Sequence, residues 1–398
     1  MERPSIWVII VVLLLGVLFL REPRFQRSEE YFLRWLIRHS QPVAKAVPMT
    51  IVETGRENPP APLETALFLQ GALEFKPTVI AIEPVLQWGQ RSKDQEQIFI
   101  DQAMRVPKLM LGAELTSAPD PDAPVAEITG FPRVTGRRGD LPEFSGIEHQ
   151  PGEDVRILST LGFINLPEES ADDVHVPLLF QYRGEVIPSF ALQAALLWMR
   201  LTPGEVKIDI GTAITLPNGT KIPIRSDGTL LVNPRMGQRA RQITLNELFL
   251  AAQQHESGAA TAIRLEDIRT QLVLARPETK TPDLFAAAVA AIQTKSFVRR
   301  VSWIFDCAMV VLAAALSGAL RRFSRIDLIM GAIAFTAAYC LIALAIISRF
   351  SIWIPAWLPL GAAWISVLFA IILPKPKDSV RTPLRRRLQR PRRSTKPQ

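Results

Sequence analysis

Four long apolar runs constrain this 398-residue chain more than any other feature. They cover Ile6–Leu20, Val301–Leu320, Leu328–Ile347 and Ile352–Leu373. About 20 apolar residues cross the roughly 30 Å hydrocarbon core of a bilayer as a helix. The last three runs reach that length and the first is shorter, so the sequence predicts an integral membrane protein with an α-helical membrane part.

The first run has two interpretations. A basic residue, Arg3, precedes it, as in a secretory signal peptide. A cleaved signal, however, ends at small residues, and this run continues into Arg21, Glu22 and Pro23. An uncleaved N-terminal transmembrane anchor, residues 1–20, is therefore favoured over a cleaved signal.

Basic residues orient the predicted spans. The formal net charge is +8, and the tail 374–398 holds ten Lys or Arg against a single acid, Asp378. Arg321, Arg322 and Arg325 lie between the second and third runs. Basic residues next to spans mark the cytoplasmic side. The tail and the 321–327 loop are thus predicted to be cytoplasmic, and residues 21–300 extracytoplasmic, in a multi-pass inner-membrane protein. The basic clusters point to lipid contact, with no nucleic acid as partner.

The extracytoplasmic part reads as one α/β domain without disulfides. The only cysteines, Cys307 and Cys340, fall inside predicted spans. Strand and helix patterns alternate from residue 49 to residue 113, which is typical of parallel α/β connections. Residues 117–157 read as a long loop. Asn-Gly and Asp-Gly turns predict an antiparallel meander of Ile208–Thr215, Lys221–Ile224 and Leu230–Asn233. The fold class is therefore a mixed sheet with flanking helices and a meander.

These segments, in this order and membrane setting, resemble a CHASE2 domain, a bacterial extracytoplasmic sensory module followed by three transmembrane helices. The resemblance spans most of residues 30–300. It rests on the following stretches: 77–84 (PTVIAIEP), 161–165 (LGFIN), 188–192 (PSFAL), 222–233 (IPIRSDGTLLVN) and Thr281-Pro282. The chain departs from the family pattern at Glu83, where Asp is usual, at His175, where Arg is usual nearby, and at Arg276, near a usual Gly.

The resemblance implies signal transduction by three transmembrane helices, residues 301–373. Relatives commonly carry a kinase or cyclase after the last span, whereas the tail here is too short to fold as an enzyme. The sequence thus predicts a sensory or binding membrane protein that is not an enzyme. It relays to a separate cytoplasmic effector, and a homo-oligomer is compatible with it. The alternatives are an envelope structural or assembly factor and, third, an extracytoplasmic hydrolase.

Candidate site residues follow from position. Glu83 ends a predicted buried strand, where ligands of parallel sheets bind, but it could equally cap a helix or pair with a buried Arg. Asp172, Asp173 and His175 lie in or beside an acidic loop that could hold a hard cation or simply be solvated. Asp306 is the one carboxylate within a span, which makes it a functional candidate or the partner of a nearby Arg. The four histidines lack metal-ligand spacing, and no catalytic motif is found, so no cofactor and no metal are expected.

One further prediction concerns the link to the membrane. No Pro or Gly occurs between Asp283 and the span that begins at Val301. The sequence therefore predicts an uninterrupted helix from Thr281 through Arg300 into that span.

Overall fold

The computed structural model describes residues 23–41, 45–89, 93–118, 128–166, 174–261, 263–278, 283–302 and 324–372, with a few residues between 304 and 312. The chain divides into two compact units. The larger, the α/β unit, comprises Glu30–Val301 and Leu341–Ile354. The smaller comprises Met1–Glu29, Ser302–Cys340 and Pro355–Gln398, and only part of it is described.

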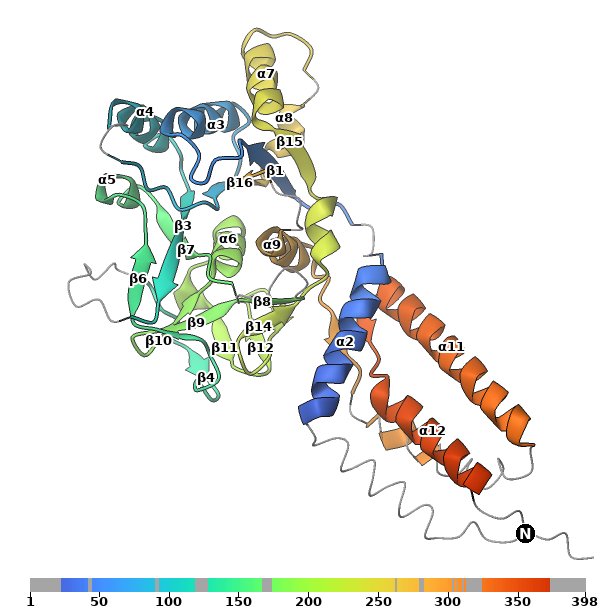
Figure 1. The fold of residues 1–398 in the computed structure, drawn as a ribbon. Helices are drawn as coiled ribbons and strands as arrows, with labels where there is room; N and C mark the ends of the chain where they lie inside the picture. Colours follow the sequence, from blue (N-terminus) through green and yellow to red (C-terminus); the bar gives the residue numbers. More distant parts are fainter. Residues whose placement is uncertain are drawn as a thin grey trace, which may run out of the picture. The chain divides into compact units, whose positions relative to one another are not determined.

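A seven-stranded mixed sheet forms the centre of the α/β unit (Figure 1). Its strands are β1 (Met49–Thr54), β2 (Val79–Ile82), β3 (Leu109–Thr116), β6 (Gly146–His149), β7 (Thr160–Phe163), β15 (Arg241–Thr244) and β16 (Leu272–Pro277). The order is β15-β1-β16-β2-β3, with β7 parallel to β3 and β6 antiparallel to the end of β3. The other pairs are parallel, so the predicted α/β wiring and mixed sheet are confirmed.

The strands are apolar on both faces because each face is covered by helices. Val79 and Ala81 of β2 belong to one hydrophobic cluster, while Ile80 and Ile82 belong to the other. Successive side chains of a strand point to opposite faces, so a strand between two helix layers needs an unbroken apolar run. One face carries α3 (Pro62–Glu74), α4 (Lys93–Ala103) and α7 (Leu245–Glu256); the other carries α6 (Phe190–Met199) and α9 (Leu284–Thr294).

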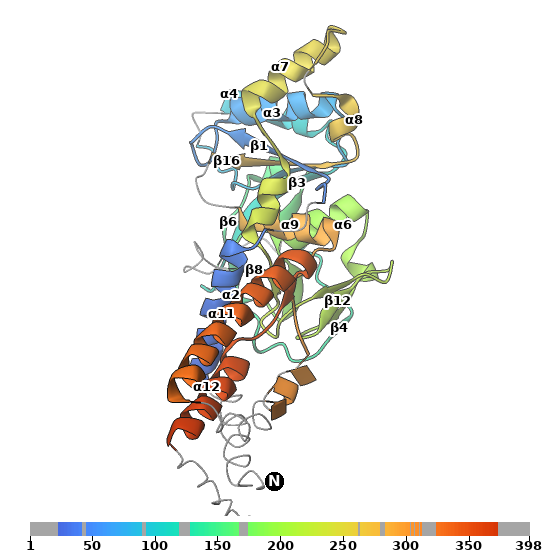
Figure 2. The same cartoon turned by 90° about the vertical axis from the view of Figure 1, so that its right-hand side faces the viewer.

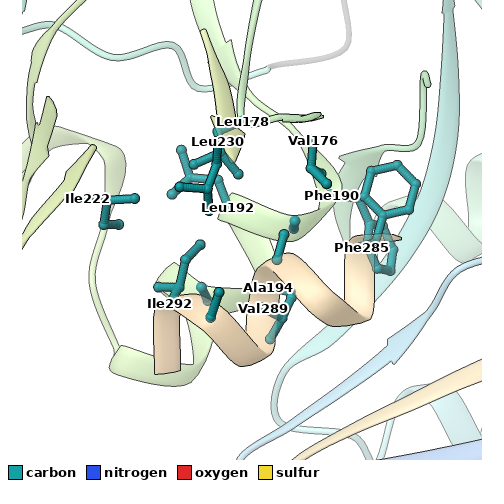
Figure 3. Close-up of a cluster of buried hydrophobic side chains, with 14 of the residues drawn as sticks. Val176, Leu178, Phe190, Leu192, Ala194, Ile222, Leu230, Phe285, Val289 and Ile292 are labelled. Atoms are coloured by element: carbon teal, nitrogen blue, oxygen red, sulfur yellow. The ribbon is translucent and has the colours of Figure 1, made fainter. Parts of the chain in front are cut away.

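Helices α6 and α9 lie between the large sheet and a set of smaller sheets (Figure 2). Residues Leu284–Ile292 of α9 are all buried, as are Phe190–Leu196 of α6. The rings of Phe190 and Phe285 lie 5.7 Å apart where the two helices meet (Figure 3). On their other side they contact Val176 and Leu230, which come from small strands. A helix that is apolar on all sides is stable in water only when surrounded in this way.

The smaller sheets confirm the predicted meander only in part. The predicted strand Ile208–Thr215 is two strands, β11 (Lys207–Asp209) and β12 (Ala213–Thr215), which pair with each other because Gly211, at φ +81°, turns the chain between them. β13 (Lys221–Pro223) is the antiparallel neighbour of β12. Gly219, at φ +78°, closes the β12–β13 hairpin as the Asn-Gly turn predicts. The third predicted strand was wrongly placed: β14 (Thr229–Leu231) pairs with β8 (His175–Pro177), since its apolar residues are needed over α6 and α9.

Residues 117–157 are not a plain loop. They contain β4 (Val134–Thr135), β5 (Glu143–Phe144), β6 and the short helix α5 (Glu153–Arg156). β5 adds to β9 (Leu179–Tyr182), which itself pairs with β10 (Glu185–Pro188), and β4 adds to β11. These strands are too short for a period to be visible in the sequence, and pairing with longer partners stabilises them.

The predicted uninterrupted helix from Thr281 into the membrane was wrong. Helix α9 ends at Thr294, and Lys295 adopts a left-handed conformation, φ 55°. The chain then extends as β17 (Arg299–Arg300), which runs parallel to β18 (Ile352–Trp353). Two segments that are distant in the sequence therefore pair as strands where the local sequence favours a helix.

Of the residues that the structure describes, one helix is long and apolar enough to cross a membrane: α11 (Arg325–Phe350). It contains the predicted run Leu328–Ile347. Helix α12 (Trp357–Ile372) covers the last run but is shorter. The predicted anchor 1–20, the tail 374–398 and most of the run 301–320 lie outside the described residues, so the four-span membrane part stays a prediction.

Candidate functional site

Three adjacent parallel strands end in charged residues at one edge of the large sheet. Glu53 of β1 is paired in register with Arg276 of β16, and Glu83 follows directly after β2 on the other side of β16. Parallel strands bring their carboxyl ends to a common edge, where ligands of α/β proteins bind. The predicted position of Glu83 at this edge is therefore confirmed.

The backbone of Glu83 is held from both sides. Its N–H donates to the carbonyl of Ala275 on β16. On the β3 side, a Cβ added to Gly112 would come within 2.0 Å of the Glu83 carbonyl oxygen. Only glycine allows this close approach, so Gly112 lets the chain after β2 pass directly against β3.

Asp283 brings a fourth charge to the cluster. Its carboxylate accepts a hydrogen bond from the N–H of Ala286 at 2.9 Å and so caps the N-terminus of α9. The same side chain lies 3.6 Å from Nη1 of Arg276, whose Nη2 donates to Glu53 at 3.2 Å. The side chains of Arg276 and Asp283 are only 7% and 6% exposed. We call Glu53, Glu83, Arg276 and Asp283 the edge cluster.

The edge cluster shifts the protonation of Glu83. Burial raises the pKa of Glu83 well above its ordinary value; the negative charge of Asp283 and a hydrogen bond to it act in the same direction, and Arg276 opposes them. The buried oxygens Oε2 of Glu83 and Oδ2 of Asp283 have no hydrogen-bond partner among the described residues. A carboxyl in this setting favours its protonated form, because only that form can donate to the other acid.

The edge cluster holds a guanidinium among its carboxylates. In the part of the chain that the structure describes, no three His, Cys, Asp or Glu residues are arranged to hold a metal ion. The guanidinium of Arg276 takes the place among the carboxylates that a cation would need. The sequence left open that Glu83 pairs with a buried Arg, but the ion pairs of Arg276 are with Glu53 and Asp283.

His175 belongs to a different set of contacts. It lies in β8, opposite Leu231 of β14, and is 8% exposed. Nη1 of Arg225 lies 2.6 Å from its Nε2, and the same guanidinium binds Oε1 of Glu30 on α2 (Pro23–His39) at 3.2 Å. With Arg225 donating, Nε2 is an acceptor. Arg225 thus connects His175 to α2, and the structure does not unite His175 with Glu83 in one site.

The remaining predicted site residues, Asp172, Asp173 and Asp306, lie outside the described residues. Sequence patterns did not reveal Glu53 or Asp283, and they marked Arg276 only as a departure from a family pattern. One signal was available for Asp283, since an Asp directly before an Ala-rich apolar run is a typical helix N-cap.

Comparison with protein-family models, with curated proteins and with solved structures found no match for this chain. Its function is therefore proposed from its own sequence and fold.

Proposed function

We propose that this chain is a membrane-anchored sensory protein of the CHASE2 type, with an extracytoplasmic α/β detector. The detector responds to a ligand or partner, and the membrane helices relay the response to a separate cytoplasmic effector. One observation carries the proposal: the α/β unit includes Leu341–Ile354, which contains the end of the apolar helix α11 and β18.

The shared core makes this observation specific. Leu36 and Ile37 of α2 pack in one hydrophobic cluster with Ala343 and Ile347 of α11 and with Val298, which follows α9. A rearrangement of the α/β fold would therefore displace the end of α11, because the two are packed directly against each other. Packed interfaces have discrete arrangements, so they can transmit such a change.

The ribbon β17–β18 gives a second link of the same kind. The N–H of Arg299 donates to the carbonyl of Ser351, and that of Val301 donates to the carbonyl of Trp353, both at 2.9 Å. The guanidinium of Arg300 lies over the Trp353 ring, 5.6 Å from its centroid. The segment that leaves α9 is thus hydrogen-bonded to the segment that leaves α11, and a flexible tether would lack this restraint.

Reporter fusions test the membrane arrangement. A periplasmic reporter inserted after Gly146 and a cytoplasmic reporter after Gln398 should both be active in bacteria. The reverse pattern would refute the extracytoplasmic detector.

Crosslinking in intact membranes separates the sensory role from the assembly-factor alternative. A sensory protein should capture a cytoplasmic partner in a manner that depends on residues 374–398 and on the ribbon, so Trp353→Ala should weaken capture. If the captured proteins are envelope components and deletion of 374–398 changes nothing, the chain is an assembly factor.

A further inference from the structure

The edge cluster contains more negative than positive groups. Three carboxylates surround one guanidinium: Glu53 comes from β1, Glu83 follows β2, and Asp283 starts α9, while Arg276 comes from β16. The fourth neighbouring strand, β3, contributes the uncharged Gly112. Arg276 already bonds to Glu53 and faces Asp283, so it cannot neutralise all three acids.

Adding one proton reduces this excess of negative charge. Two buried carboxylates that face each other cannot both ionise without strong repulsion, and one proton held between them turns the repulsion into a hydrogen bond. Burial, the charge of Asp283 and hydrogen bonding to it raise the pKa of Glu83, which is the direction this geometry requires. Because such a pair is coupled, the proton belongs to the pair and not to either residue alone.

Asp283 connects this proton to the rest of the α/β unit. Its carboxylate caps α9, which runs through the core and ends at Thr294, five residues before β17. A repulsive force on Asp283 acts on the first turn of α9, since the cap bond and the contact with Glu83 involve the same side chain. Weakening an N-cap bond shifts the local opening equilibrium of a helix end by roughly three- to tenfold.

We propose that Glu83 and Asp283 form a proton-binding site: they share a proton in acidic surroundings, and on losing it they separate and loosen the N-terminal turn of α9. In the sensory protein the proton is then a stimulus, an interpretation that rests on the proposed function. The binding of the proton itself does not depend on that function.

Infrared spectroscopy of the full chain in lipid nanodiscs tests the proton site. A pH titration should show a carboxylic-acid C=O band that persists above the range in which ordinary carboxyls ionise and that Glu83→Gln abolishes. Glu114→Gln is the matched control, because Glu114 also lies at the end of a strand of the sheet but is 40% exposed and paired with His149. The control should retain the band. Its absence from the wild type across the titration, or its survival in Glu83→Gln, would overturn the proposal.

Hydrogen exchange on the same samples tests the coupling to α9. After correction for intrinsic rates, the amides of the first turn of α9 should exchange about three- to tenfold faster in the deprotonated wild type than in the protonated one. Glu83→Gln, which mimics the protonated acid, should remain slow at every pH. Should Glu83→Gln disturb the fold, Glu83→Asp is the second variant. It keeps the carboxylate on a shorter side chain and should reduce the difference in exchange rate between low and high pH. An exchange rate in α9 that follows pH equally in wild type and Glu83→Gln would overturn the coupling.

The two proposals fail in different ways. Failure of the reporter fusions would remove the sensory role but leave the infrared band and its loss in Glu83→Gln unchanged. Conversely, partner capture that depends on the ribbon at every pH, together with an absent band, would retain the sensory role and remove the proton site.

Discussion

Helices α9 and α11 are both apolar on nearly all sides, yet α9 is buried and α11 is mostly exposed. Residues Leu284–Ile292 of α9 are all buried in the α/β unit, whereas only 17% of the most apolar window of α11 is buried. Leu341 and Ile342 of α11 are 68% and 57% exposed. Apolar composition alone therefore does not distinguish a core helix from a candidate membrane helix.

Length makes the distinction. At 1.5 Å per residue, the 11 residues of α9 reach about 16 Å, roughly half the hydrocarbon thickness, and the 26 residues of α11 reach about 39 Å. A short apolar helix must find its surroundings within the protein, and α9 finds them in two β layers and α6. The exposed surface of α11 is the surface that the proposed membrane would cover.

The largest expected effect comes from placing a charge in the buried helix. Ala288 of α9 is fully buried, so Ala288→Asp introduces an unpaired carboxylate into the core at a cost of several kcal/mol. The α/β unit should lose its resistance to protease and its cooperative thermal transition. A variant that melts like the wild type would show that α9 is not packed as described.

The matched substitution in the exposed helix should act on insertion instead of folding. Ala334 of α11 is exposed, so Ala334→Asp leaves the α/β core intact, but an Asp near the centre of a span costs about 2.5–3.5 kcal/mol of insertion free energy. Alkaline extraction of membranes should release more of this variant, with protease resistance of the α/β unit unchanged. Loss of α/β folding with normal membrane retention would reverse the comparison.

Truncating one leucine in each helix environment should show the same difference through a smaller change in unfolding free energy. Leu192 of α6 is fully buried between the sheet layers (Figure 3), and Leu192→Ala should lower the unfolding free energy of the α/β unit by about 2–5 kcal/mol. Leu341→Ala on the exposed side of α11 should change it by less than about 0.5 kcal/mol in detergent. Denaturant titration followed by tryptophan fluorescence measures both, and equal losses would contradict the assigned burial.

Glycine substitutions give the finest comparison. A Cβ added to Gly237, in the 3-10 helix Pro234–Arg239 that packs on α9, would lie 3.2 Å from the backbone nitrogen of Ala287. Gly237→Ala should therefore destabilise the α/β unit by about 1 kcal/mol. Gly331 of α11 has open space around it, so Gly331→Ala should stabilise its helix by about 0.5–1 kcal/mol. Thermal melting of both variants should shift in opposite directions, and a common direction would argue against the difference in packing.

The sequence was informative where side chains alone decide the structure. The run Val79–Ile82 predicted a strand buried on both faces, and Asn218-Gly219 predicted a hairpin, because composition and turn chemistry are local properties. Strand β15 was missed, since an edge strand of sequence RQIT has only one buried residue, Ile243, and shows no apolar period. Short strands such as β4 and β5 depend on their partners and leave little local signal.

Pairing between distant segments could not be predicted from the sequence. The position of Glu83 at a strand end could be inferred, but its meeting with Arg276 and Asp283 requires that β16 insert between β1 and β2. Helix α9 ends at Thr294, and β17 after it pairs with β18, which lies about 50 residues further along the chain. Of the predicted site residues, Glu83 belongs to the edge cluster, His175 lies apart from it, and Asp172, Asp173 and Asp306 lie outside the described residues.

The central position of β16 also determines when the sheet can form during synthesis. Strands β1 and β2 leave the ribosome early, but each has its inner edge filled by a segment that is synthesised roughly 200 residues later. Until Leu272–Pro277 appears, the nascent sheet has two unpaired edges at its centre, the kind of surface on which chains aggregate. The α/β unit therefore completes its sheet late in synthesis, only shortly before α11 is made.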